Sequence, residues 1–370
     1  MDRDLTIGIE EEFQIIDPDS RDLCSLLTEM VAASPPIDDV ELKAELHQSV
    51  VEVGTTICAD IAEARREVLR NRRAAARAAR QVGMRIGAAS THPFARWQDQ
   101  PITQAKHYQC LLEEYQDLVR ANLIFGLHVH VGIADREEAI AIFNSARYFL
   151  PHLLAISTSS PFFESRDTGL KSARSQIFKR LPRSDIPTRF DSYQQFLWFV
   201  NLLIKTGCID DGRRIWWDVR PHAEFSTLEF RVCDLPLRAD ETIAIAALVQ
   251  ALVAFLIRLH RGNRSWRLFQ PALIQENKWR ALRYGIDAEL IDFGKEIEVP
   301  VRDLIPELIE LLDEDIRALG SSAEIARLGD ILDHGTGADR QRRVFAETGD
   351  LKAVVDYIIE ESERGVPDIT

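Results

Sequence analysis

The chain has 370 residues, of which 46% are apolar and 28% are charged, an ordinary balance for a globular protein with a sizeable core. Its formal net charge of −14 would repel a phosphate backbone, so we expect no nucleic-acid partner. The five cysteines are scattered, odd in number and without a C-x-x-C pair. This argues against a disulfide framework or a zinc knuckle and indicates a reducing compartment.

No segment is typical of a signal peptide or a membrane span. Residues 1–6 are rich in charge and run directly into a strand-like segment, which leaves no room for a signal sequence. The longest apolar run, Ile243 to Ile257, contains Gln250 and is short for a membrane helix. We therefore expect a buried core helix at this run, no membrane partner, and a cytoplasmic protein.

The first half of the chain alternates between extended and helical patterns. Extended segments are predicted at Leu5–Ile16, Lys43–Thr56, Met84–Ala89 and Leu123–Ile133. Helices are predicted at Asp60–Val82, Lys106–Asn122 and Asp135–Leu150. Asp60 is expected to cap a solvated Ala/Arg/Glu helix, and Pro151 is expected to stop the third helix.

The second half is mainly helical after a variable central stretch. Residues 158–187 are rich in Ser, Arg, Gly and Pro and are expected to form an extended, mobile loop. Strands are predicted at Ile215–Val219 and Ser226–Cys233, and helices at Thr242–His260, Asp303–Leu319, Ser322–Leu332 and Leu351–Ser362. Short turns between some strands predict an α+β fold, with a mostly antiparallel sheet and helices packed on one side. We expect residues 1–370 to form a single domain, since no repeat or low-complexity linker divides them.

Two of the apolar strands carry charged or imidazole side chains. Glu10 and Glu12 alternate along the first strand and therefore share one face. Buried adjacent carboxylates need a cation between them, and a solvated edge strand is an equally weighted alternative. His128 and His130 also share one face, which indicates a ligand or phosphate contact, with two core or surface histidines as the alternative.

Two further pairs remain open at the level of sequence. Glu229 and Arg231 share a face of the strand near residue 230, where a structural ion pair is the common alternative. Glu45 and Glu52 are seven residues apart. On a helix this spacing would place them on one face, whereas a strand would need a bulge or a bend to bring both inward.

Taken together, five carboxylates and a histidine on separate strands predict a sheet face that holds hard cations through oxygen ligands and one imidazole. The sequence contains no G-x-x-x-x-G-K-[ST] or G-x-G-x-x-G motif, so any phosphate would be held by metals and arginines. It also lacks an H-E-x-x-H motif and a serine nucleophile elbow.

The chain also resembles a known family. The runs GIEEEFQIID, GAASTHPF, GLHVHVG, IWWDVRP and TLEFRVCDLPL follow, in this order, the pattern of the carboxylate–amine ligases of the type-2 glutamate–cysteine ligase group. This resemblance implies a glutamine-synthetase-like catalytic fold, in which the concave face of a curved sheet binds Mg²⁺ or Mn²⁺ and the ATP phosphates. It also implies weak glutamate–cysteine ligase activity.

Carried over residue by residue, the resemblance implies metal ligands at Glu10, Glu12, Glu45, Glu52, His128 and Glu229, with Glu45 aligned most loosely. It implies that Arg231 contacts the γ-phosphate. Arg220 is expected either to serve the same end or to be structural, and His130 is expected beside the nucleotide. Arg174 is expected either to receive a substrate carboxylate or to be an exposed loop residue, and His92 either to belong to the site or to cap a turn.

We therefore expect an ATP-dependent carboxylate–amine ligase. A carboxylate would attack the γ-phosphate of ATP, and an amine would displace phosphate from the resulting acyl phosphate. The partners would be small carboxylates and amines, amino acids among them, and a homodimer is left open. The alternatives are a guanidino phosphotransferase, a metal-dependent hydrolase, and a binding protein without activity.

Overall fold

The computed structural model describes residues 5–33 and 40–367, and its centre is a seven-stranded sheet. The strands follow the order β10 (Val219–Pro221), β11 (Thr227–Phe230), β5 (Leu127–Gly132), β1 (Ile7–Ile16), β3 (Val50–Gly54) and β2 (Lys43–Ala44). The seventh strand, β4 (Arg85–Gly87), pairs with the C-terminal part of β1. Every pair in this sheet is antiparallel, which confirms the predicted sheet.

Shorter pairs of strands lie outside this sheet. They are β6 (Phe162–Phe163) with β7 (Arg166–Asp167), β8 (Ser184–Asp185) with β9 (Trp216–Trp217), and β12 (Glu289–Asp292) with β13 (Ile297–Pro300). The pair β8–β9 is parallel and the other two are antiparallel.

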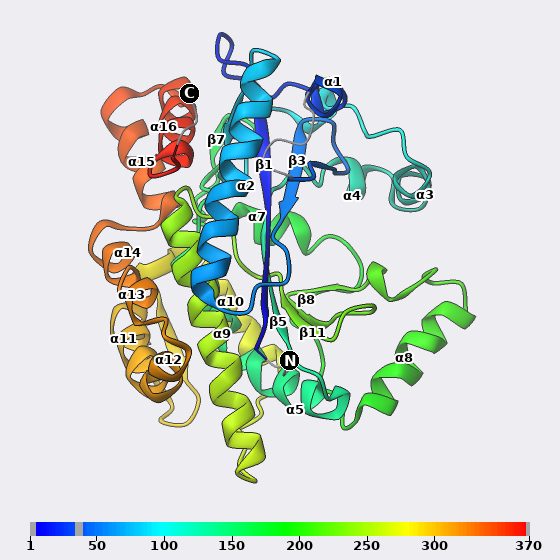
Figure 1. The fold of residues 1–370 in the computed structure, drawn as a ribbon, viewed down its shortest axis with the longest axis vertical. Coiled ribbons are helices and arrows are strands. Elements are labelled where there is room, and N and C mark those ends of the chain that lie inside the picture. The colour runs from blue at the N-terminus through cyan, green and yellow to red at the C-terminus, as the bar shows by residue number, and fades with distance from the viewer. Residues whose placement is uncertain (1–4, 34–39, 368–370) are drawn as a thin grey trace.

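Two long helices, α2 (Ile61–Gln81) and α9 (Ala239–Arg261), lie across one face of the sheet (Figure 1). The central strand β1 sends alternate apolar side chains into the core under these helices, namely Ile7, Ile9, Phe13 and Ile15. Asp60 caps α2 as predicted, since its side chain accepts a hydrogen bond from the backbone N–H of Glu63 at 2.8 Å. The expectation of a solvated helix is wrong, because the alanine-rich face of α2 is buried and Arg72 is 0% exposed.

Two helical stretches, Arg136–Ser157 and Ala239–Arg261, are long and apolar enough to cross a membrane by length and composition. In the fold, 83% and 89% of their apolar windows are buried inside the protein. Every residue from Ile243 to Ile257 is buried in α9, which confirms the predicted core helix. Both stretches are therefore explained as core helices.

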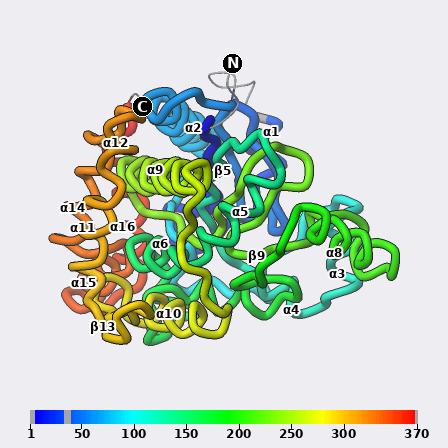
Figure 2. Tube along the Cα trace, turned by 90° about the horizontal axis from the view of Figure 1, so that it is seen from below, coloured from blue at the N-terminus to red at the C-terminus, as the bar shows by residue number. Residues whose placement is uncertain are grey.

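The other helices complete the fold around this core. They are α1 (Leu27–Ala33), α3 (Lys106–Tyr115), α4 (Asp117–Arg120), α5 (Arg136–Ala146), α6 (Leu150–Ser157), α7 (Ala173–Phe178), α8 (Tyr193–Lys205), α10 (Pro271–Tyr284), α11 (Val301–Leu311), α12 (Asp313–Leu319), α13 (Ser322–Ile325), α14 (Leu328–His334), α15 (Gly337–Thr348) and α16 (Leu351–Glu363). Helices α11 to α16 gather on one side of the molecule, whereas α3 and α8 lie on the opposite side (Figures 1 and 2).

Two local predictions are wrong. Pro151 does not end a helical segment: a 3-10 turn at Arg147–Phe149 follows α5, and Pro151 lies in the first turn of α6, where a missing N–H costs no hydrogen bond. Residues 158–187 do not form an extended loop either, because they contain β6, β7, α7 and β8. Their serines Ser159, Ser160 and Ser172 are 0% exposed and hydrogen-bond inside the protein, so the high serine content does not reflect solvent exposure here.

Candidate active site

Alternation along β1 distributes its three consecutive glutamates between two faces. Glu10 and Glu12 line a cavity of about 900 Å³, whereas Glu11 is 2% exposed and lies 2.7 Å from Arg72 of α2. The hydroxyl of Thr242, on α9, also donates to Glu11 at 2.9 Å. The cavity therefore lies on the face opposite α2 and α9. The solvated-edge alternative is wrong, since β1 is the central strand of the sheet.

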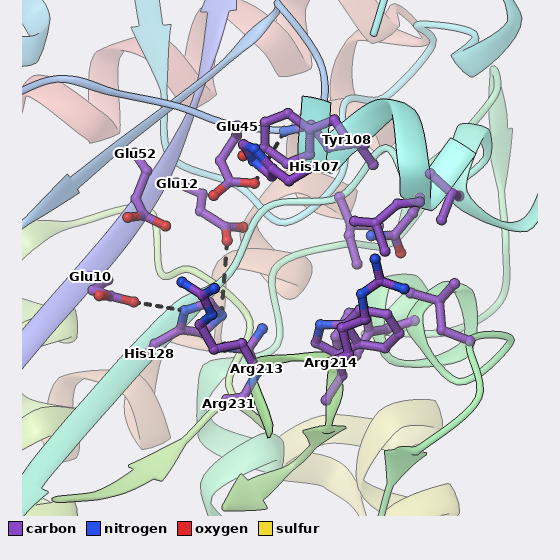
Figure 3. A pocket seen from close by; sticks show the side chains of 18 of the residues that line it. Glu10, Glu12, Glu45, Glu52, His107, Tyr108, His128, Arg213, Arg214 and Arg231 are labelled. Atoms are coloured by element: carbon purple, nitrogen blue, oxygen red, sulfur yellow. Dashed lines mark hydrogen bonds and ion pairs between the residues drawn. The ribbon is translucent and has the colours of Figure 1, made fainter. Parts of the chain in front are cut away.

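Three carboxylates form the first cluster in the cavity, which we call the glutamate cluster: Glu12, Glu45 and Glu52 (Figure 3). One ligand oxygen from each lies within 4.8 Å of the others. Glu52 is opposite Glu12 in the register of β1 and β3, and Glu45 directly follows β2, which pairs with β3. A chain reversal between β2 and β3 therefore brings Glu45 and Glu52 together, so neither a helix nor a bulge is needed.

The glutamate cluster holds its protons tightly. Burial raises the pKa of Glu12 to about 7, and the charge of Glu52 adds to this effect. Burial, followed by the charges of Glu52 and Glu12, raises the pKa of Glu45 well above its ordinary value. Burial and the charge of Glu10 also raise the pKa of Glu52. The ion pair of Glu52 with Lys43, at 3.2 Å, lowers this pKa but does not cancel the increase. When all three groups are ionised, the cluster would therefore carry more negative charge than the side chains around it neutralise.

These properties fit a divalent cation. Carboxylate oxygens are the ligands that Mg²⁺ and Ca²⁺ prefer, and a bound cation would keep all three groups ionised. The charges of Arg174 and Arg231 lower the pKa of Glu12, and the charge of Lys43 lowers the pKa of Glu52. Neither pKa returns to its ordinary value. A metal would supply the missing positive charge.

A second cluster, which we call the histidine cluster, consists of Glu10, His128 and Glu229, with one ligand atom from each within 4.8 Å of the others. His128 Nδ1 lies 3.2 Å from the carboxylate of Glu10, and His130 Nε2 lies 3.7 Å from it. Burial raises the pKa of Glu10, but hydrogen bonds and charges from His128 and His130 outweigh this effect and lower it. Burial, assisted by the charge of Arg231, lowers the pKa of His128 to about 4, so a neutral imidazole is available as a ligand.

Glu229 differs from the other carboxylates because it lies between two arginines. Arg220 Nε donates to Glu229 Oε2 at 2.6 Å, and Arg231 pairs with Glu229 Oε1. Burial raises the pKa of Glu229, but the charges of Arg231 and Arg220 together lower it well below the ordinary value. The structural ion pair considered for this strand is therefore present, and a metal-ligand role for Glu229 stays a prediction.

All ten residues that the sequence singled out for metal, nucleotide or catalytic roles line this one cavity: Glu10, Glu12, Glu45, Glu52, His128, His130, Arg174, Arg220, Glu229 and Arg231. His92 lies elsewhere. It is 1% exposed, its Nε2 lies 2.9 Å from the carbonyl of Arg21, and its Nδ1 accepts from the backbone N–H of Ala95 at 3.0 Å. His92 is therefore a turn-stabilising residue.

Other residues of the cavity wall have no signal in the sequence. His107 and Tyr108, on α3, lie beside Glu45 (Figure 3). Arg213 and Arg214 line the part of the cavity that also contains Arg231 (Figure 3). Polar residues on one side of a helix such as α3 have the same pattern as a solvated face. Their position across from β1 becomes visible only in the folded chain.

The family model described as "Glutamate-cysteine ligase family 2(GCS2)" matches residues 6–357, which is nearly the whole chain. The chain belongs to this family. Membership confirms the resemblance noted in the sequence and the predicted enzyme class, a ligase.

Relatives in the family are similar along their whole length. A protein of Solibacter usitatus is 53% identical over 363 residues, which cover 98% of this chain and 94% of the relative. A protein of Sorangium cellulosum is 52% identical over 368 residues, which cover 99% and 98%. Both carry the provisional name glutamate–cysteine ligase 2.

Two solved structures share the fold at 14% sequence identity. The glutamate–cysteine ligase of Francisella tularensis, solved in complex with AMP, has a TM-score of 0.69 over 99% of this chain and 90% of its own. A bifunctional glutathione synthetase from Pasteurella multocida has a TM-score of 0.72 over 98% of this chain and 53% of its own. These similarities confirm the predicted fold class, an antiparallel sheet with helices in the manner of glutamate–cysteine ligases.

The raised pKa of Glu12 predicts how pH affects stability without metal. Its pKa is about 7 in the folded chain and 4.5 ordinarily, so the folded state binds this proton more tightly than the unfolded state. The resulting stability is complete below about pH 4.5 and is lost as the pH rises through about 7. A bound divalent cation should restore it, so Mg²⁺ should raise the Tm more at about pH 8 than at about pH 5.5. Thermal unfolding in EDTA and in Mg²⁺ measures this; equal Mg²⁺ effects at both pH values would contradict it.

Proposed function

We propose that this chain joins a carboxylate to an amine at the expense of ATP, with L-glutamate and L-cysteine as the first substrate pair to test. The observation that supports this most directly is the convergence of two carboxylate-rich clusters and five arginines on one cavity in a member of a glutamate–cysteine ligase family. An anionic nucleotide requires such local positive charge and metal ligands in a chain whose net charge is −14.

The glutamate cluster and the histidine cluster would hold Mg²⁺, with Mn²⁺ as the second choice for the cluster that contains an imidazole. Bound divalent cations neutralise phosphate oxygens and make the γ-phosphorus more electrophilic. Arg231 and Arg220 would bind the phosphoryl oxygens, and Glu229 orients both guanidinium groups through its two oxygens. His130, beside Glu10, would lie next to the nucleotide.

The reaction would occur in two steps. A substrate carboxylate oxygen attacks the γ-phosphorus of ATP, which forms an acyl phosphate and releases ADP. The amine nitrogen then attacks the acyl carbon, the bond to the phosphate oxygen breaks, and inorganic phosphate and a proton leave. Arg174 would bind an anionic group of the acid substrate, and the cavity walls would exclude water from the acyl phosphate.

The test is ADP release with L-glutamate and L-cysteine in Mg²⁺, with detection of γ-glutamylcysteine by mass. Because family membership does not specify the acid or the amine, the same assay should screen further amino acids and small amines. A stable phosphoguanidine product would instead indicate a guanidino phosphotransferase. Metal-dependent hydrolysis of a substrate in the absence of ATP, together with a Tm that nucleotide does not raise, would indicate a metal-dependent hydrolase. We also propose a cytoplasmic, single-domain enzyme whose partners are small amino-acid substrates.

Gly126 offers a focused test of the role of Arg174. A Cβ at residue 126 would lie 2.5 Å from Nη2 of Arg174 and 3.2 Å from Nε2 of His128, so Gly126→Ala should displace mainly the guanidinium while the fold stays intact. We expect the KM of the acid substrate to rise about 10- to 100-fold, with a smaller change in the KM of ATP. Steady-state kinetics with each substrate varied in turn measures both. An equal rise in the two KM values would contradict a role for Arg174 in binding the acid.

A further inference from the structure

Arg174 is a buried cation at the wall of the cavity. It is 3% exposed, its Nη2 donates to the carbonyl of Arg231 at 3.1 Å, and its guanidinium lies 5.8 Å from the ring centroid of Phe178. Within the described residues, its Nε has no hydrogen-bond partner. A cation with a fixed position and an unused donor is suited to bind an anionic group that enters the cavity.

The backbone that carries Arg174 depends on two serine hydroxyls. Helix α7 has six residues, too few to be stable by itself. Its N-cap, Ser172, accepts from the backbone N–H of Ser175 at 3.3 Å. The hydroxyl of Ser160 accepts in the same way from the backbone N–H of Arg174 at 3.2 Å. We call residues 159–175 the Arg174 arm. Because both hydroxyl oxygens accept hydrogen bonds from the backbone of this arm, their own protons are directed to other acceptors.

Both hydroxyl protons point to the carboxylate of Asp234. Ser172 donates to Oδ1 at 2.8 Å, and Oδ2 accepts from the hydroxyl of Ser160 at 2.7 Å and from the backbone N–H of Ser159 at 2.9 Å. An ionised carboxylate can only accept, so it forces each serine to donate toward it and to turn its lone pairs toward the arm's backbone. Asp234 is 0% exposed, so no water competes for these bonds.

Asp234 also connects the arm with the metal-ligand side of the cavity. It forms an isolated β-bridge with Gly126, and the backbone N–H of Gly126 donates to Glu12 Oε2 at 2.6 Å. Burial raises the pKa of Asp234, and the charge of Arg174 is the largest effect that opposes this, so the two charges stabilise each other. Asp234 itself is absent from the described residues that line the cavity.

We propose that Asp234 is a positioning residue for substrate binding: it fixes the Arg174 arm so that the guanidinium faces the anionic group of the acid substrate. It acts through Arg174 and does not touch the substrate. This inference rests on the proposed function, because it assigns the acid substrate to Arg174.

A double-mutant cycle tests the inference. Asp234→Asn replaces one accepting oxygen by an NH₂ group that donates. This group would face at least one of the three donors that the carboxylate accepts from, so at least one of those hydrogen bonds is lost. We expect it to raise the KM of the acid substrate about tenfold while kcat changes less than about threefold. In an Arg174→Ala background the same substitution should change that KM less than about twofold, because its target is already absent. Asp315→Asn is the matched control: Asp315 is 6% exposed and paired with Arg258 at 2.7 Å, outside the cavity, and its substitution should leave the KM unchanged.

A second variant and a crystal structure keep the test decisive if Asp234→Asn does not fold. Ser172→Ala retains the carboxylate but removes one of its contacts, and it should raise the same KM about threefold or more. The structure of the variant that folds should show Arg174 displaced. Equal increases in KM in both backgrounds, or an unmoved Arg174 with an unchanged KM, would overturn the positioning role. A wild-type protein that ligates no acid and amine would overturn the proposed function instead, and this is recognised before any substitution is made.

Discussion

Glu12→Gln is expected to reduce ATP-dependent ligation more than about 100-fold while the fold remains intact. Glu12 belongs to the glutamate cluster, and its raised pKa indicates that its ionisation, like that of Glu45 and Glu52, depends on added positive charge. The amide keeps the shape of the side chain and one oxygen, but it removes the charge that a divalent cation would bind. Measurement of ADP release at saturating substrates, together with Mg²⁺ binding by calorimetry, tests the effect.

The adjacent residue provides the matched control. Glu11→Gln changes the same functional group one position along the strand, but its side chain faces Arg72 rather than the cavity. This variant should lose stability, whereas its ligase activity per folded molecule and its Mg²⁺ affinity should stay within about threefold of wild type. Turnover like that of wild type in Glu12→Gln would refute the metal assignment, and loss of Mg²⁺ binding in Glu11→Gln would show that the two faces are not independent.

Arg72→Met should have the largest effect on stability. Arg72 is 0% exposed, and its guanidinium donates to Glu11, Thr242 and the carbonyl oxygens of Pro236 and Leu237. Removal of this cation leaves the carboxylate of Glu11 buried without a compensating charge, although the hydroxyl of Thr242 still donates to it. We expect the free energy of unfolding to fall by about 3–5 kcal/mol. Urea unfolding followed by tryptophan fluorescence measures the change.

The control for this substitution is an exposed arginine on another helix. The side chain of Arg317 is 69% exposed and pairs with Asp313, so Arg317→Met should cost less than about 1 kcal/mol. In addition, Glu11→Leu combined with Arg72→Met should be more stable than Arg72→Met alone, because no unpaired charge remains. An unfolding midpoint of Arg72→Met equal to that of wild type would show that the buried pair does not stabilise the contact of β1 with α2.

Some of the site could be predicted because it depends on local geometry. Side chains two apart on a strand face the same way, so the sequence alone placed Glu10 with Glu12 and His128 with His130. The cap at Asp60 and the core helix near Ile243 follow from equally local patterns. The combination of five carboxylates and a histidine on separate strands suggested one cation-binding sheet face, and the family resemblance then assigned the individual ligand roles. The strand pairing itself is not encoded in any single segment.

The tertiary structure decided which distant groups meet. Glu45 joins Glu52 through a chain reversal and the pairing of β2 with β3, and no spacing rule within one element describes that contact. It also decided that Glu11 and Arg72, 61 residues apart, form a buried pair, which turned an apparently solvated helix into part of the core. In the same way, a serine-rich stretch that suggests a mobile loop is held by Asp234. Side-chain direction is thus a property of the local chain, whereas burial and partnership arise only when remote segments share one interior.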